Sequence, residues 1–389
     1  MSDWQQIIRD QSIATLEKLA DKFGHDVIDV EGLKPAFDNF QMRITPAALE
    51  QIKEVGDPMW NQYIPTVEEL HVVDGVIDSL DEDGDSPVPN ITHRYPDRAL
   101  FLVSPVCATY CRFCTRRRKV GDPEKIPLNQ YESAFQYLRE HTEIRDVILS
   151  GGDPMMLSDR RLEYLFQQLR AIPHIEIIRI GSRITSHLPE RITPEFCEMV
   201  QKYHPIFMNT HFNHPSELTP AAVASLDRLS KAGVSLGCQT VLLKGVNDDP
   251  KVMMKLMHEL LKARVRPYYI FMADQVAGGE HFRTTVQKGL EIMQALRGWT
   301  SGLAVPQFVI DSPGGGGKVP LLPEYLESIT DDEVVFRNYE GKRFVYKQPR
   351  PAPSAPAEVE PAAEVGIVPI SRRKTAAPRR TKRRRAAGE

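Results

Sequence analysis

Hydrophobic and polar positions follow two different periods along the chain. Over the first ninety residues apolar side chains recur at helical spacing and predict a helical region over residues 1–90, starting with Ile7, Ile8, Ile13, Leu16 and Leu19. The segment DEDGDSPVPN, rich in turn-forming residues, separates this region from the rest of the chain. From Ala99 the pattern changes to short apolar runs that alternate with amphipathic segments of about a dozen residues, which is typical of βα units.

Seven apolar runs after this change are candidate strands. They read ALFLVSPV, DVILSGG, IEIIRIGS, PIFMNTH, VSLGCQTVLL, RPYYIFMA and LAVPQFVID. Six or seven βα units in about 210 residues fit a parallel α/β barrel, complete or partial. An open, doubly wound sheet produces the same pattern and stays an alternative. We therefore expect a helical region at 1–90, a (β/α) barrel core at 91–300 and a C-terminal segment at 301–347 that carries further chemistry.

The composition changes once more near the end of the chain. Residues 348–389 pass through PRPAPSAPAEVEPAAEV to a basic run that ends RRTKRRR. Such a stretch has too few large apolar residues to offset the entropy lost on ordering. The sequence therefore predicts a disordered tail over residues 348–389, rich in Pro and Ala and then basic.

Charge is distributed unevenly, which the near-neutral total of −3 conceals. Residues 372–385 hold nine of the 49 basic residues and no acid, and Glu389 alone follows as an acid, so 40 basic against 51 acidic residues leave −11 on the remainder. A basic end joined to an acidic body leaves nucleic-acid contact by the tail as one possibility. No run of eighteen apolar residues and no basic flank followed by an apolar core is present, so we expect a cytoplasmic protein with no membrane span.

Three of the five cysteines lie within eight residues, as C-x3-C-x2-C: Cys107, Cys111 and Cys114. Disulfides do not persist in a reducing cytosol, so a metal role is favoured for these three. Thiolates bind both zinc and iron–sulfur iron, but a structural zinc site takes four protein ligands. On a 4Fe-4S cluster three thiolates leave one iron open for a non-protein ligand. Zinc with a distant fourth ligand, or three buried structural thiols, stay as alternatives.

A run of four glycines precedes Lys318 in the sequence DSPGGGGKVP. The run does not fit a phosphate loop, because Ser312 stands where that motif needs glycine and Val319 stands where it needs Ser or Thr. Glycines permit close approach of the backbone to a ligand, and a lysine held at their end can form a Schiff base with an aldehyde cofactor. A flexible hinge with a solvated lysine is the alternative from these residues alone.

The spacing in CATYCRFC resembles the hallmark of the radical S-adenosylmethionine (SAM) superfamily. Together with HFRT and DSPGGGGK, the sequence CATYCRFCTRRR closely resembles the lysine 2,3-aminomutase family, from about Asn90 to about Tyr325. This resemblance implies a partial parallel barrel of the radical SAM type, a 4Fe-4S cluster whose open iron chelates SAM, and pyridoxal 5′-phosphate (PLP) carried by Lys318. The implied reaction moves the amino group of lysine from carbon 2 to carbon 3.

The resemblance also implies which residues bind the cofactors. Arg94 and Arg98, in THRYPDR, match the arginines that hold the PLP phosphate, for which a guanidinium fork is suited. The segment SGGDP matches the one that contacts the methionine amine of SAM, and a histidine and a glutamine match further SAM contacts. These expected SAM-binding residues are Ser150, Gly151, Gly152, Asp153, His211 and Gln239.

Three further matches concern the substrate. Arg116 matches the arginine that pairs with the substrate α-carboxylate, and Asp274 and Asp311 match the two aspartates that bind the ε-ammonium of lysine. Burying an ammonium group without compensation is costly, so a site that selects lysine needs anionic partners there. The similar glutamate aminomutases carry lysine and asparagine at these two places. Lysine is the preferred substrate, and arginine and glutamate stay as alternatives.

Partners and one departure complete the resemblance. It implies a homo-oligomer and an electron donor such as flavodoxin or ferredoxin. Lysine aminomutases of the well-known kind add a zinc site from a cysteine after the fifth strand, where this chain reads GVNDDP, so we expect no structural zinc. Two rival functions stay open: supply of β-lysine for modification of a translation factor, and a nucleic-acid-modifying radical SAM enzyme. Lys318 with Arg94 and Arg98 weighs against the second rival.

Overall fold

The computed structural model describes residues 3–349, and these fall into two compact units. The first unit comprises residues up to 325 together with residues 337–343. The second comprises residues 326–336 and residues from 344 onward. All but the first two residues of the tail expected at 348–389 lie outside the described part of the chain.

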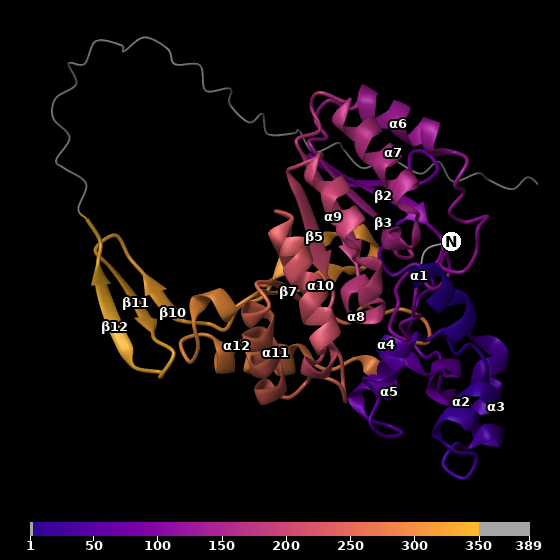
Figure 1. The fold of residues 1–389 in the computed structure, drawn as a ribbon. Coiled ribbons are helices and arrows are strands. Elements are labelled where there is room, and N and C mark those ends of the chain that lie inside the picture. The colour runs from indigo at the N-terminus through magenta and orange to yellow at the C-terminus, as the bar shows by residue number, and fades with distance from the viewer. Residues whose placement is uncertain (1–2, 350–389) are drawn as a thin grey trace, which may run out of the picture. The chain divides into compact units, whose positions relative to one another are not determined.

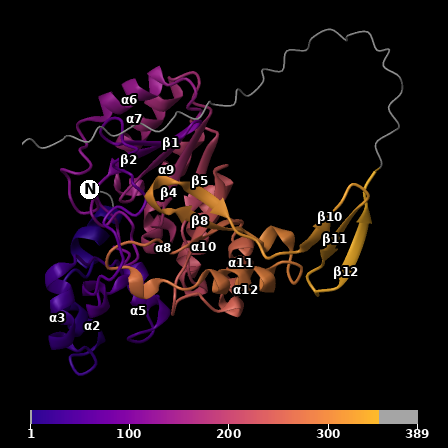
Figure 2. The ribbon, with the colours of Figure 1, turned by 180° about the vertical axis from the view of Figure 1, so that it is seen from behind.

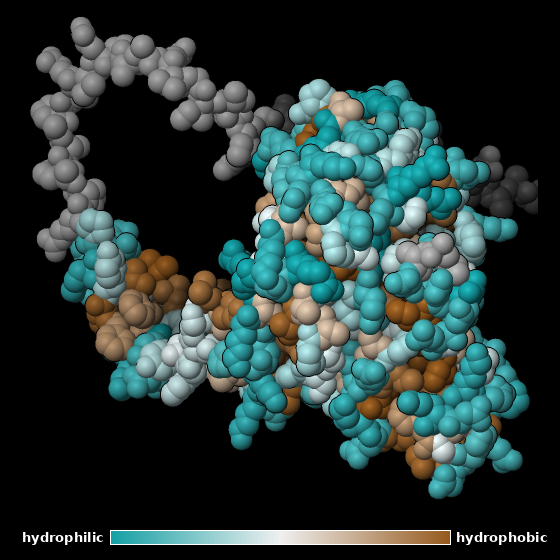
Figure 3. Space-filling view, in the orientation of Figure 1, coloured by the Kyte–Doolittle hydropathy of each residue, from teal (hydrophilic) through white to brown (hydrophobic). Residues whose placement is uncertain are grey.

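Short helices follow one another between Asp3 and Leu70, whereas residues 71–90 form turns and bends (Figure 1). These helices pack around a small core of their own that includes Leu19, Ile44, Trp60 and Tyr63. A valine-lined hollow of about 330 Å³ opens beside this core, and Figure 3 shows apolar atoms at the surface there. The helices are α1 (Asp3–Gln6), α2 (Leu16–Phe23), α3 (Val30–Asn39), α4 (Pro46–Leu49) and α5 (Pro58–Tyr63).

A nine-stranded sheet forms the centre of the first unit, with its strands in chain order from β1 to β9. All seven predicted strands are confirmed and pair in parallel, which is the arrangement expected of successive βα units. They are β2 (Arg98–Ser104), β3 (Asp146–Gly151), β4 (Ile177–Ser182), β5 (Ile206–Thr210), β6 (Ser235–Leu242), β7 (Arg266–Met272) and β8 (Gln307–Ser312).

Two antiparallel strands that the sequence patterns did not predict border this parallel sheet: β1 (Ile91–Tyr95) and β9 (Gly317–Pro320). The backbone N–H of Lys318 on β9 donates a hydrogen bond of 3.0 Å to the Tyr95 hydroxyl on β1. The two edges of the sheet therefore meet, and the sheet curls into a nearly closed barrel. The expected α/β fold of the radical SAM type is confirmed.

Helices cover the outside of the sheet (Figures 1 and 2). Three of them begin with proline directly after a capping residue, Thr193, Thr219 or Asp249, whose side chain accepts a hydrogen bond from the first turn. Their apolar faces join the main core together with Phe101, Ile180 and other strand residues. The helices are α6 (Tyr131–Glu140), α7 (Asp159–Arg170), α8 (Ile184–His187), α9 (Pro194–Gln201), α10 (Pro220–Lys231), α11 (Pro250–Lys262) and α12 (Val286–Leu296).

The second unit is built around a three-stranded sheet, β10 (Leu326–Ile329), β11 (Glu333–Arg337) and β12 (Arg343–Lys347). Strands β10 and β11 pair antiparallel, and the rings of Phe336 and Phe344 stack with centroids 6.3 Å apart. None of these strands was expected from the sequence. Separately, none of the helices among residues 3–349 combines the length and apolar composition needed to cross a membrane.

Candidate active site

Most of the residues expected to carry chemistry lie where the parallel strands end. Cys107 follows β2, Asp153 follows β3, His211 follows β5 and Asp274 follows β7, while Asp311 lies near the end of β8. The parallel pairing brings the carboxyl ends of these strands to the same end of the barrel. Barrels of this kind bind ligands at that end.

Backbone contacts between β2 and β3 hold the cysteine loop in position. The N–H of Gly152 donates to the Ser104 carbonyl at 2.6 Å, and the N–H of Asp153 donates to the Val106 carbonyl at 2.8 Å. A Cβ on Gly151 would lie 2.3 Å from the Ser104 oxygen, and a Cβ on Gly152 would lie 2.5 Å from the Val106 oxygen. Glycine is therefore required at both positions because the backbone of β3 packs directly against the start of the cysteine loop.

The three clustered cysteines, all partly buried, line one cavity of about 410 Å³, together with Arg117 and Arg118. Burial, and then neighbouring negative charge, raises the pKa of the Cys107 thiol well above its usual value, and burial followed by Cys111 raises the pKa of Cys114. Iron that replaces the thiol protons would relieve this repulsion, so the donor set fits an iron–sulfur cluster. Within residues 3–349 no three His, Cys, Asp or Glu side chains converge on a point suited to a single metal ion.

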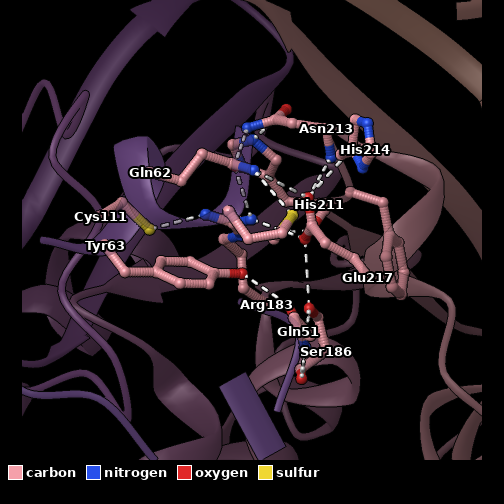
Figure 4. Close-up of polar contacts among 12 residues, drawn as sticks. Gln51, Gln62, Tyr63, Cys111, Arg183, Ser186, His211, Asn213, His214 and Glu217 are labelled. Carbon is pink, nitrogen blue, oxygen red and sulfur yellow. Dashed lines mark hydrogen bonds and ion pairs between the residues drawn. The ribbon is translucent and has the colours of Figure 1, made fainter. Parts of the chain in front are cut away.

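A buried polar network extends from Cys111 into the N-terminal helices (Figure 4). The guanidinium of Arg183, which follows β4, donates from Nη1 to the Cys111 Sγ at 2.8 Å and from Nη2 to Glu217 Oε2 at 2.7 Å. Glu217 Oε1 in turn accepts from the backbone N–H groups of Asn213 and His214. Gln62 on α5 joins the same network through Arg183 and Asn213.

Lys318 reaches the predicted ammonium site with its own side chain. Its Nζ lies 2.9 Å from Asp311 Oδ1 on the adjacent strand, and 5.2 Å from the centre of the Phe271 ring. Burial, and next the negative charge of Asp311, raise the pKa of Asp274 to about 7, although the charge of Lys318 opposes this. The amine of Lys318 therefore contacts one carboxyl group and lies close enough to a second to interact with it electrostatically.

Arg94 and Arg98 flank the ring of Tyr95 at the closure of the barrel. The Arg98 Cζ lies 3.8 Å from the centre of that ring, and a Cβ on Gly315 would lie 3.0 Å from the Arg94 guanidinium nitrogens. The amine of Lys318 lies 5.9 Å from the same ring centre. The Lys318 amine and the Arg98 guanidinium both lie near the Tyr95 ring, and the Arg94 guanidinium lies beside the glycine run. These groups fit a phosphate-bearing aldehyde such as PLP. Arg94 also forms an ion pair with Asp85.

Arg116 is held in place by two acceptors. Its Nε donates to Glu82 Oε1 at 2.7 Å and its Nη1 donates to the Ser150 hydroxyl at 3.2 Å. The Glu82 side chain is only 6% exposed, so this pair is shielded from solvent. A guanidinium has five N–H donors, and these contacts leave donors free for a carboxylate ligand.

Among the expected SAM contacts, His211 and Asp153 lie beside the cysteine loop. The ring of His211 lies 5.6 Å from that of Phe113, within the cysteine loop, and burial lowers the pKa of His211 well below its usual value. Asp153 accepts hydrogen bonds from the Ser182 hydroxyl and the Arg183 N–H. Gln239 lies on β6 on the face opposite the buried side chains of its two neighbours. The binding roles of all these residues stay predictions.

Sequence reasoning missed several residues of this site. Arg183 directly follows the predicted strand β4, just as Asp153 follows β3, so its place after the carboxyl end of a strand could have identified it as a site residue. Tyr95 lies between the two arginines of THRYPDR. Glu82 and Glu217 carry no local signal, because their partners Arg116 and Arg183 lie more than thirty residues away in the chain.

Comparisons with known proteins identify the family of this chain. Residues 101–257 match the family model of the radical SAM superfamily, and residues 293–375 match the model named lysine-2,3-aminomutase. The L-lysine 2,3-aminomutase of Fusobacterium nucleatum is 50% identical over 350 residues, which is 89% of this chain and 82% of that protein. That of Acetoanaerobium sticklandii is 47% identical over 352 residues, 90% of this chain and 85% of that protein. The glutamate 2,3-aminomutase of Clostridioides difficile is 44% identical over 342 residues, 87% of this chain and 80% of that protein.

The curled parallel sheet, the cysteine loop after its first parallel strand and the superfamily match define a radical SAM enzyme. This class implies a 4Fe-4S cluster and SAM as cofactors and a small-molecule substrate. The chain belongs to the lysine 2,3-aminomutase family, as both the family model and relatives that align along most of their length show. It is therefore an aminomutase, an isomerase.

Proposed function

We propose that the protein interconverts L-lysine and β-lysine by moving the amino group between carbon 2 and carbon 3. The observation that carries this proposal is an alkylammonium group paired with Asp311, with the buried carboxyl group of Asp274 near enough to interact with both charges. That ammonium belongs to Lys318, whose Nζ lies 2.9 Å from Asp311. A substrate with an ammonium at the end of its side chain has the same chemistry, and a substrate with a carboxylate there would be repelled.

Each end of the substrate has its own partner in this proposal. Arg116 binds the α-carboxylate, and the contacts of Arg116 with Glu82 and Ser150 fix the plane of its guanidinium. Asp274 and Asp311 bind the ε-ammonium once Lys318 has turned to the cofactor. Binding at both ends fixes the carbon atoms between them and excludes water from the reacting centre.

The cofactors supply the radical chemistry. Cys107, Cys111 and Cys114 would hold the cluster, on which SAM would supply a hydrogen-abstracting radical. Lys318 would hold PLP, which would supply a π system for the migrating nitrogen after the substrate amine has replaced Lys318. Arg94 and Arg98 hold the PLP phosphate in this proposal. The SAM contacts in this proposal are Ser150, Gly151, Gly152, Asp153, His211 and Gln239. No structural zinc is part of the proposal.

The cellular setting is proposed from the same chemistry. A cluster on three thiolates needs a reducing environment, so we assign the protein to the cytoplasm, with flavodoxin or ferredoxin as electron donor. We also propose a homo-oligomer. Nucleic acid is not required by any residue of the proposed site.

The decisive experiment is anaerobic reconstitution with iron, sulfide, SAM and PLP, followed by chromatography of the products from lysine, glutamate and arginine. We expect β-amino acid from lysine alone. The Lys318→Ala variant should retain the iron but lose both turnover and the visible absorbance of lysine-bound PLP. Full activity of this variant would refute the assignment of Lys318.

A glutamate 2,3-aminomutase is the second candidate, because a relative of that activity aligns along most of this chain. The two carboxyl groups of Asp274 and Asp311 argue against it, since a third carboxylate would have to approach a site in which burial, and then repulsion by Asp311, already raise the pKa of Asp274. Conversion of glutamate but not lysine in the same assay would replace our proposal with this one.

A further inference from the structure

Arg183 occupies an unusual position for a charged side chain. It is only 8% exposed, and it donates to the sulfur of Cys111, one of the three cysteines expected to bind iron. The carboxylate of Glu217 on its other side is fully buried. Figure 4 shows the guanidinium between these two groups.

The rest of the network fixes the guanidinium in this orientation. Its Nε donates to the His211 carbonyl at 3.2 Å and its Nη2 also donates to Gln62 Oε1 at 3.3 Å. Glu217 is held by the N–H groups of Asn213 and His214, at 2.8 and 3.0 Å, and by the Ser186 hydroxyl at 3.1 Å. Because all these partners are themselves tied to the protein, the positive end of the ion pair cannot turn away from Cys111.

We propose that the Arg183–Glu217 pair is a positioning element that raises the reduction potential of the iron–sulfur cluster through the contact between Arg183 and Cys111. Hydrogen bonds to the cluster sulfurs, net charge and burial are the means by which a protein sets this potential. The inference rests on the cluster implied by the superfamily and not on the choice of substrate, so it can fail while the proposed reaction stands.

The sign of the effect follows from the order of the charges. Reduction adds one electron to the cluster, so a nearby positive charge stabilises the reduced form and a nearby negative charge destabilises it. Arg183 touches the sulfur, whereas Glu217 lies beyond the guanidinium. The pair therefore acts as a dipole whose positive end faces the cluster, in a buried setting where screening by solvent is weak.

The proposal is tested by measuring the midpoint potential of the reconstituted cluster without SAM, by titration followed by electron paramagnetic resonance. The variant Arg183→Met/Glu217→Gln removes both charges, and replacing a buried ion pair by uncharged residues is often tolerated. The amide oxygen of the new glutamine can still accept from the two backbone N–H groups. We expect the ratio of reduced to oxidised cluster at a fixed potential to fall at least tenfold, which is a shift of about 59 mV for a one-electron couple.

Glu217→Gln alone should act in the opposite direction, because it leaves the charge of Arg183 uncompensated. A rise in the reduced fraction of this variant supports the proposal even where the double variant assembles no cluster. An unchanged potential in either variant, or a shift of the single variant in the same direction as the double one, overturns it.

The matched control is the ion pair of Arg179 and Asp146, with Nε and Oδ1 2.9 Å apart. Arg179 lies on β4, the strand that Arg183 follows, and Asp146 is the first residue of β3, at the opposite end from the cysteine loop. Arg179→Met/Asp146→Asn should leave the cluster potential unchanged. A comparable fall in this control would show that any lost ion pair has the same effect, and would overturn the proposal.

Discussion

Ionisation of the Asp274 carboxyl group lowers the free energy of unfolding of the substrate-free protein, and this effect can be measured by unfolding the protein at several pH values. Burial and the neighbouring Asp311 raise the pKa of Asp274 from 3.8 to about 7. At about 1.36 kcal/mol per pKa unit, keeping this carboxylate ionised in the folded chain costs roughly 4 kcal/mol. The variant Asp274→Asn removes the ionisable group at nearly constant size.

The sign of the pH dependence follows from proton binding. Between pH 3.8 and about 7 the folded chain holds a proton on Asp274 that the unfolded chain has released. Folding stability therefore falls as the pH rises through this window, and above pH 7 the full cost is present. Asp274→Asn should accordingly be more stable than the wild type by up to about 4 kcal/mol at pH 8, and the difference should shrink toward pH 4.

Urea unfolding of the full chain, before loading with iron or PLP, measures this difference at several pH values. The same comparison in an Asp311→Asn background tests the cause, because loss of the Asp311 charge lowers the pKa of Asp274. The stabilisation should then be smaller. A difference between wild type and Asp274→Asn that does not change from pH 5 to pH 8 would refute the reasoning. We expect Asp274→Asn to bind lysine poorly, because it lacks the carboxylate whose charge the substrate ammonium would neutralise.

Two further predictions test how the site is held together. Glu82→Gln removes the charged partner of Arg116 and should raise the KM for lysine about tenfold, equivalent to about 1.4 kcal/mol, with a smaller change in kcat. A fall in kcat as large as the rise in KM would point to a role in the chemical step instead. Gly152→Ala places a Cβ 2.5 Å from the Val106 oxygen, so the cysteine loop must shift and the reconstituted variant should contain less iron per chain. Gly302→Ala, where a Cβ meets nothing within 4 Å, is its control, and equal iron in both variants would contradict the requirement for glycine.

The parallel part of the fold was predictable because each strand is a short apolar run followed by an amphipathic helix. The two antiparallel strands were not. β1 reads ITHRY and β9 reads GKVP, and neither has the apolar run that marks a buried strand. Ile91 of β1 does join the main core, but Arg94 on β1 and Lys318 on β9, which carry candidate chemistry, are only partly buried. Neither strand therefore shows the run of buried apolar residues by which a strand is recognised in a sequence.

The same distinction applies to the candidate site. The cysteines and Lys318 lie in local motifs that a sequence displays directly. Glu82 and Glu217 are defined by the arginines they neutralise, and those pairs exist only after the chain has brought distant segments together. Pairing across distant segments leaves no periodic trace in the sequence, which is why neither glutamate was predicted.

The antiparallel strand β9 gives the number of glycines before Lys318 a meaning of its own. Asp311 on β8 lies directly opposite Lys318 on β9, and Ser312 lies opposite Gly317, so residues 313–316 form the connection between the two strands. Directly opposite side chains of an antiparallel pair lie on the same face of the sheet, which places Lys318 beside Asp311. The length of the connection fixes the register of a hairpin, so deleting or adding one glycine should change which residue of β9 lies opposite Asp311 without altering any other residue of the site. The number of glycines therefore determines that the residue opposite Asp311 is a lysine.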